Sequence, residues 1–344
     1  MKGVAKEALI SMIKDKGVEL RSSDGVTALY ETDARYFPTD SMVKNIVGRA
    51  IRAQRLHAHD QPACEAFVKR EQELKPDDKW YFRASTPQQV GTDDQFGIHG
   101  PFVDMQSCPP IQDFLLVHQT EFQQQMMRKY GRTIVGMDAT YKVCKWSFPF
   151  FLLTVVTNHG HAFPVAMFFM ENESGSGIAE ALSIIRKWNP DWRPAYMMVD
   201  KDTKEENAIN EQLAPLGTKV LLCDFHRLQA WERALNKTDM GVRKGRKLAV
   251  KAALSDLARA GTIELFEAKL AAFKQSDDYM CNPKLSSYLA THWWPCAELW
   301  AACYRKAYHG GIDTNNHQEA LNRALKYRFL NSRVSNEVYD GTCV

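Results

Sequence analysis

Long apolar runs are missing from this sequence of 344 residues. The longest, residues 148–156 and 162–170, have nine positions each, whereas a helix that spans a bilayer needs about 20. Charged residues recur through the first 17 positions, so no apolar core of signal-peptide type is present there. We therefore expect an intracellular protein that has no membrane partner.

Paired cysteines and a strong net charge are also missing. The eight cysteines are scattered and none forms a Cys-x-x-Cys pair, a pattern that indicates reduced thiols rather than a disulfide framework. Lysine and arginine number 44 and the acids 41, which leaves a net charge of +3. This balance excludes a polybasic tail but leaves room for a local basic surface.

Five short apolar runs predict buried strands. Helical patterns over 177–188, from 203, and over 225–235 alternate with the later runs. Three strands in succession favour an antiparallel meander, and the later strands join through crossover helices. This order is typical of a ribonuclease H-like α/β fold: a mixed five-stranded sheet with helices on both faces. The expected strands are 133–138, 150–157, 162–170, 195–200 and 219–223.

A strand-free stretch interrupts this pattern and predicts an all-helical insertion, and a mainly helical region precedes the core. Helices are expected at 41–55, 61–74 and 111–130, in the insertion at 246–260, 263–273, 284–293 and 297–308, and finally at 316–327. The expected organisation is an N-terminal helical region for DNA binding or an accessory role (1–80), a connection with a helix (81–130), the catalytic core (131–235), the insertion (236–311), the final core helix (312–330) and a tail (331–344).

Three acids stand out by position. Asp138 and Asp200 lie at the ends of apolar runs, and Glu319 lies in the last helix. A carboxylate at a buried strand end is costly unless it is paired or bound to a metal, and strand ends face the crevice where open α/β sheets bind ligands. Three such acids would hold two Mg²⁺ or Mn²⁺ ions about 4 Å apart.

Local chemistry alone leaves this assignment open. A strand-end aspartate often caps a helix or closes a turn, and a helical glutamate is often solvated. Asp202 and Asp224 have similar settings.

The amino-acid sequences of four segments resemble motifs of a known family. These segments are DATYK from Asp138, MVDKD around Asp200, CDFH from Cys223 to His226, and TNNHQEALN around Glu319. In this order they resemble the Mutator-like (MULE) transposases over about residues 111–330. The resemblance implies a ribonuclease H-like catalytic domain of the DDE type, in which Asp138, Asp200 and Glu319 are the catalytic and metal-binding residues. Cys223, His226, Asn316 and Asn322 are the supporting motif residues.

The function that the resemblance implies is DNA transposition in the nucleus. The Mg²⁺ or Mn²⁺ ions would support phosphodiester hydrolysis and strand transfer at transposon ends, and joining two ends implies a homodimer. Two alternatives remain: a domesticated, transposase-derived DNA-binding regulator without catalysis, and a simple ribonuclease H-like nuclease.

Two further features allow a functional and a structural interpretation. Cys223 and His226 are two ligands, too few for a zinc site, so we expect them to pack or orient the helix that bears them. Residues 236–251 hold six basic residues and one acid, which favours contacts with DNA phosphates, although a solvated helix face would have the same composition. The expected DNA-binding residues are Arg243, Lys244, Arg246 and Lys247.

Overall fold

The computed structural model describes residues 39, 41–43, 45, 60–85, 112–144, 146–306, 314 and 316–329, with only the main chain at 316, 317, 328 and 329. The chain divides into two compact units, Met1–Arg70 with Glu337–Val344, and Glu71–Asn336. The sheet, the insertion and all the predicted catalytic acids belong to the second unit. None of the described helices combines the length and apolarity that crossing a membrane requires.

The centre of the second unit is a mixed sheet of seven strands, in the order β1-β2-β5-β4-β3-β6-β7. β3, β4 and β5 are antiparallel neighbours, and β6 and β7 continue from β3 in parallel. The five predicted strands and their ribonuclease H-like order are confirmed. The bounds are β1 Lys79–Arg83, β2 Leu115–Gln119, β3 Ile134–Thr140, β4 Phe150–Val156, β5 Ala162–Met170, β6 Tyr196–Val199 and β7 Lys219–Leu222.

Two strands beyond the predicted five extend the sheet at the β5 edge. β2 pairs antiparallel with β5, and β1 pairs with β2. The helix predicted over 111–130 is therefore wrong in its first half, and only α4 (Glu121–Tyr130) is helical there. All five residues of β2 are buried, so the apolar run is that of an inner strand. Thr120 and Gln123 form a capping box that begins α4 immediately after it.

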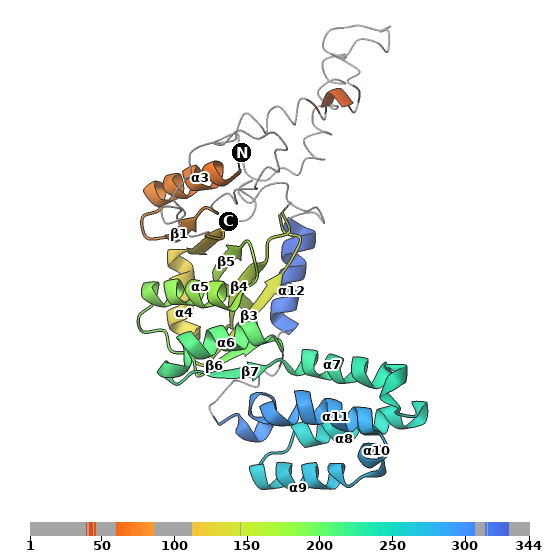
Figure 1. The fold of residues 1–344 in the computed structure, drawn as a ribbon. Helices are drawn as coiled ribbons and strands as arrows, with labels where there is room; N and C mark the ends of the chain where they lie inside the picture. The colour runs from red at the N-terminus through yellow and green to blue at the C-terminus, as the bar shows by residue number, and fades with distance from the viewer. Residues whose placement is uncertain are drawn as a thin grey trace, which may run out of the picture. The chain divides into compact units, whose positions relative to one another are not determined.

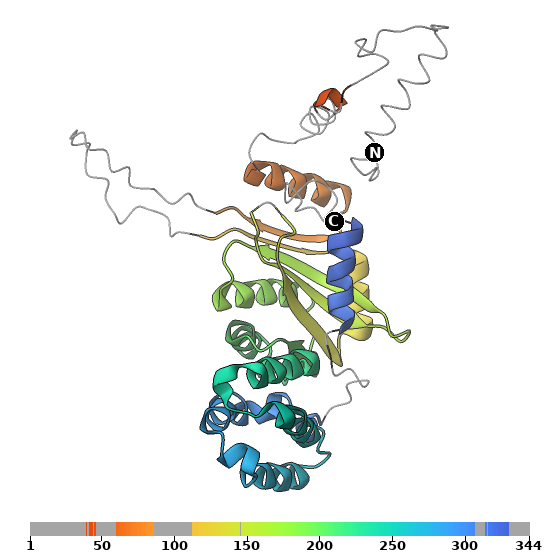
Figure 2. The ribbon, with the colours of Figure 1, turned by 90° about the vertical axis from the view of Figure 1, so that its right-hand side faces the viewer.

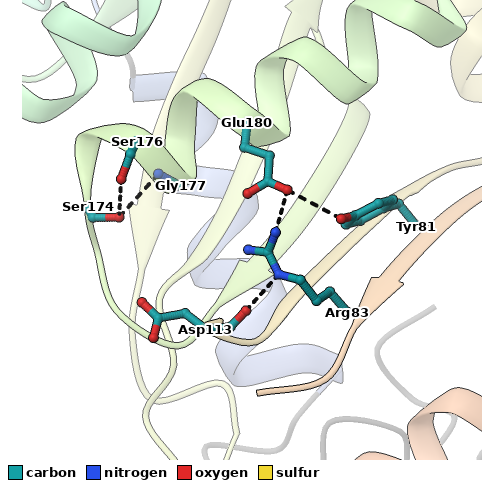
Figure 3. A network of polar contacts seen from close by, with 7 residues as sticks. All are labelled: Tyr81, Arg83, Asp113, Ser174, Ser176, Gly177 and Glu180. Carbon is teal, nitrogen blue, oxygen red and sulfur yellow. Dashed lines mark hydrogen bonds and ion pairs between the residues drawn. The ribbon is translucent and has the colours of Figure 1, made fainter. Parts of the chain in front are cut away.

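Polar contacts tie this extension to α5 (Gly175–Trp188) (Figure 3). The hydroxyl of Tyr81 and the guanidinium of Arg83, both on β1, donate to Oε1 of Glu180 on α5. Arg83 Nε also donates to the main-chain oxygen of Asp113 at 3.0 Å. β1 is thus held by these side chains as well as by its main-chain pairing with β2. Four of its five residues are only half-buried.

Helices cover both faces of the sheet. α4, α5 and α6 (Thr203–Gln212) pack on the face that contains most of the core, including Met137, Leu153 and Leu182. α12 (Asn316–Ala324) lies on the opposite side of the sheet from α4 (Figures 1 and 2). Successive side chains of a strand point to opposite faces of the sheet. Adjacent residues of β3 therefore face different helical layers.

The insertion is helical, as predicted, with one correction. α7 (Asp224–Asn236) leads into α8 (Lys247–Ala258), α9 (Ile263–Lys274), α10 (Asp277–Met280) and α11 (Pro283–His292). The helix predicted over 297–308 is wrong for residues 297–306, and residues 307 and 308 lie outside the described residues. Short 3₁₀ turns, η4 (Trp294–Leu299) and η5 (Ala302–Tyr304), take its place, with Ala301 extended between them. The indole of Trp300 donates to the main-chain oxygen of Trp293 at 3.0 Å, which holds this turn in place of a helix.

The aromatic residues of the insertion form its core. The rings of Trp231, Trp293 and Trp300 pack edge to face, and all three side chains are fully buried. Of the other expected helices, α3 (Asp60–Leu74) confirms 61–74. Residues 41–43 and 45 are helical, while 46–55 lie outside the described residues.

Candidate active site

Asp138 and Asp200 are brought together by the register of two parallel strands. Gly136 of β3 is aligned with Met198 of β6, and each aspartate comes two residues later on its own chain segment. Parallel strands end at the same edge of a sheet, so both carboxylates lie at that edge. Asp138 is still within β3, and Asp200 follows β6 directly.

The last helix joins this pair from a distant part of the sequence. On α12, Asn322 Nδ2 donates to Asp138 Oδ2 at 2.6 Å, and Gln318 Nε2 donates to the main-chain oxygen of Leu152 on β4 at 2.7 Å. Both side chains are buried. Because Glu319 and Asn322 are three positions apart, they lie on the same side of the helix, which turns Glu319 toward the aspartates.

His226 connects two of the three acids. It lies in the first turn of α7; its Nδ1 contacts Oδ1 of Asp200, and its Nε2 is 3.0 Å from Oε1 of Glu319. The ring is half-buried. Asp138, Asp200 and Glu319 therefore belong to one cluster, linked through His226 and Asn322, and the five residues come from four separate elements.

The electrostatics of the cluster are those of crowded acids around one base. Burial, and then the charge of Asp200, raise the pKa of Asp138 to about 7. The carboxylate of Asp200, followed by Cys223, raises the pKa of His226 to about 10. At neutral pH the imidazole is therefore a cation that offsets part of the acidic charge.

A fourth acid, Glu205, belongs to the same neighbourhood and was not predicted. It lies on α6 and is only 4% exposed, and its Oε2 is buried without a hydrogen-bond partner. Burial, and then the charges of Asp200 and Asp138, raise its pKa well above the usual range. A sequence signal was present, because Glu205 shares the buried stripe of α6 with Ala208 and Ile209.

The two other strand-end acids have structural roles. Asp202 caps α6 by accepting from the main-chain N–H of Lys204 at 2.7 Å. Asp224 pairs with Arg227 at 3.2 Å and with Arg305 at 2.8 Å. Tertiary structure thus separates Asp138 and Asp200 from neighbours that look alike in the sequence.

The structure places three of the four supporting motif residues at the acidic cluster. Cys223 is buried at the position just before α7, and Asp200, Cys223 and His226 place one ligand atom each within 4.8 Å of one another. Asn322 holds Asp138, as described above. The main chain of α12 begins at Asn316, and the side chain of Asn316 lies outside the described residues.

The predicted DNA-binding residues lie at the entry to the insertion. Arg243, Lys244 and Arg246 are exposed, and Lys247 is half-buried. Arg246 is occupied by Asp278, to which it donates from Nε at 3.0 Å and from Nη2 at 2.6 Å. The stretch is therefore accessible, but one of its four charges is already neutralised.

A model of a known protein family matches part of the chain. The model described as "Zinc finger SWIM domain-containing protein 1/3, RNaseH-like domain" matches residues 111–216. The matched segment runs from β2 to the turn η1 (Ala214–Leu216) and includes Asp138, Asp200 and Glu205. With the strand order, this match makes the fold ribonuclease H-like.

Proposed function

We propose that this chain is a metal-dependent DNA-processing enzyme of the Mutator-like transposase class, acting by phosphodiester hydrolysis and strand transfer. One observation carries the proposal: Asp138, Asp200 and Glu319 converge at the sheet edge where ribonuclease H-like folds bind ligands. DNA is the expected substrate and partner, the nucleus the expected compartment, and a homodimer the expected assembly.

The donor set fits Mg²⁺ or Mn²⁺. All three proposed ligands are carboxylates, the oxygen donors that these hard cations prefer. Burial, and then the charge of Asp200, raise the pKa of Asp138 to about 7, and a divalent cation would relieve the part of that shift that comes from repulsion. When bound, two such ions activate a hydroxyl nucleophile and stabilise the charge on the transferred phosphoryl group.

The protein's own residues orient the three acids. Asn322 donates to one oxygen of Asp138 and so fixes the orientation of that carboxylate. Gln318 attaches α12 to β4, which holds the helix that presents Glu319. His226 contacts Asp200 and Glu319 together, so its imidazolium keeps those two carboxylates near each other.

The test is cleavage of an end-labelled DNA duplex by the full chain with and without Mg²⁺. Nicking that is lost in Asp200→Asn and Glu319→Gln, and kept in the exposed control Asp191→Asn, supports the proposal. Binding of the duplex with no Mg²⁺-dependent nicking favours the domesticated regulator instead. A chain that neither binds nor cuts DNA contradicts both functions.

A further inference from the structure

We infer that Asp200, Cys223 and His226 form a site for a zinc-class divalent cation, distinct in donor chemistry from the three-carboxylate set although Asp200 belongs to both. Sequence alone counts only two such ligands, Cys223 and His226. The fold supplies the third, because Asp200 follows β6 and Cys223 follows the adjacent parallel strand β7.

The three ligand atoms are close enough for one ion. The Asp200 oxygen, the Cys223 Sγ and the His226 nitrogen all lie within 4.8 Å of one another. In a tetrahedral zinc site, with bonds of about 2.0 to 2.3 Å, ligand atoms stand about 3.5 Å apart. The observed atoms are therefore gathered on the scale of one coordination sphere.

The local structure prepares both α7 ligands. Cys223 occupies the N-cap position of the helix and His226 its first turn, so their side chains project from the same end of α7. Cys223 is also buried, which keeps water from competing for the sulfur.

Two of the ligand atoms contact each other directly. Oδ1 of Asp200 and Nδ1 of His226 are both buried and form an ion pair. A divalent cation bound by both atoms would displace the proton of Nδ1 into solvent and take over its role of joining Asp200 to His226. This observation is independent of the identity of Cys223.

Glu319 completes the arrangement from outside. Its carboxylate lies 3.0 Å from Nε2 of His226, the ring nitrogen that faces away from Asp200. A metal-ligating histidine usually donates its other N–H to a carboxylate, which fixes the tautomer and turns the free lone pair toward the metal. Glu319 is positioned to be that carboxylate for His226.

The donor types decide which cation binds. Thiolate and imidazole favour Zn²⁺ and Co²⁺ over Mg²⁺, whereas the oxygen set favours Mg²⁺. Occupancy of the soft site would engage Asp200 directly and Glu319 through His226. Zinc is therefore expected to oppose the carboxylate site rather than to serve it.

The experiment titrates the metal-free full chain with Co²⁺ and records the thiolate-to-cobalt charge-transfer band, followed by displacement with Zn²⁺. The band should appear in the wild type and in Cys144→Ser, a buried-thiol control, and be absent from Cys223→Ser. Asp138→Asn, which alters only the oxygen set, should keep the band. Glu319→Gln should weaken cobalt binding by about 10–100-fold, the usual effect of losing such a carboxylate.

Circular dichroism establishes that each variant is folded, and His226→Gln serves as a second ligand variant if Cys223→Ser is not. Loss of the band in His226→Gln supports the site. A wild type without the band, or a folded Cys223→Ser that keeps it, overturns the inference. These readouts need no DNA, so the inference and the proposed function succeed or fail separately.

Discussion

Asn322 Nδ2 lies 2.6 Å from Asp138 Oδ2, although 184 positions separate the two residues in the sequence. The bond connects α12 to β3, and the whole insertion lies between these two elements in the sequence. It gives a physical role to an asparagine that the motif alone leaves unexplained: a buried amide that aims a carboxylate. The helix that carries Glu319 is thereby placed relative to the acid that it is proposed to work with.

Asp138→Asn should raise the thermal stability of the metal-free protein at pH 8 and change it little at pH 4. The folded pKa of Asp138 is about 7, above its usual value of 3.8. The folded state therefore binds the extra proton, and stability falls as pH rises through that window. The amide introduced by this substitution would keep a hydrogen bond to Asn322 without the charge.

Differential scanning fluorimetry at both pH values measures this effect, with the exposed Asp191→Asn as the control. An Asp138→Asn variant that is no more stable than wild type at pH 8 would contradict the crowded-acid description of the cluster.

Glu205→Gln should likewise stabilise the metal-free protein, with a gain that grows as pH rises. Burial and the charges of Asp200 and Asp138 raise the pKa of Glu205 well above its usual 4.5. The stability of the folded protein therefore falls as the pH rises above 4.5 and Glu205 must ionise in its buried site. Glutamine has the same shape and carries no charge. Urea unfolding across a pH series checks the trend, and the exposed Glu211→Gln should show none of it.

Trp300→Ala should destabilise the protein by about 3–5 kcal/mol, the range for removing a buried tryptophan. Trp300 is 1% exposed, packs against Trp231 and lies 5.6 Å from the guanidinium of Arg227. Trp146, 57% exposed, is the matched control, and its change to alanine should stay within about 0.5 kcal/mol. Equal urea midpoints for the two variants would rule out a tryptophan core in the insertion.

Changing Arg243, Lys244, Arg246 and Lys247 together to alanine should flatten the salt dependence of DNA binding. Each phosphate contact contributes about 0.9 to the slope of log K against log salt. Because Asp278 already holds Arg246, we expect a decrease of about 2.7, three contacts' worth.

Fluorescence anisotropy with a labelled duplex at several salt concentrations gives the slope. The double variant Lys187→Ala, Lys219→Ala removes two exposed charges elsewhere and should leave the slope intact. An unchanged slope in the quadruple variant would identify residues 243–247 as a solvated face.

The sequence by itself determined the five core strands, their order and the helical character of the insertion. These elements are buried on at least one face, and apolar runs and helical periodicity in the sequence indicate which residues are buried. The same reasoning failed at β2, where an apolar run preceding a helix was assigned to that helix, and at 297–308, where tryptophan packing overrides helical periodicity.

Only the tertiary structure decided which acids meet. Asp138, Asp200, Asp202 and Asp224 look alike locally, but strand register aligns the first two, while the others cap a helix or pair with arginine. Glu205 joins the cluster because α6 packs its buried stripe against the sheet. His226 reaches two carboxylates because α7 begins beside β6. The convergence of distant segments depends on strand register and helix packing, and no single segment of the sequence determines either of them.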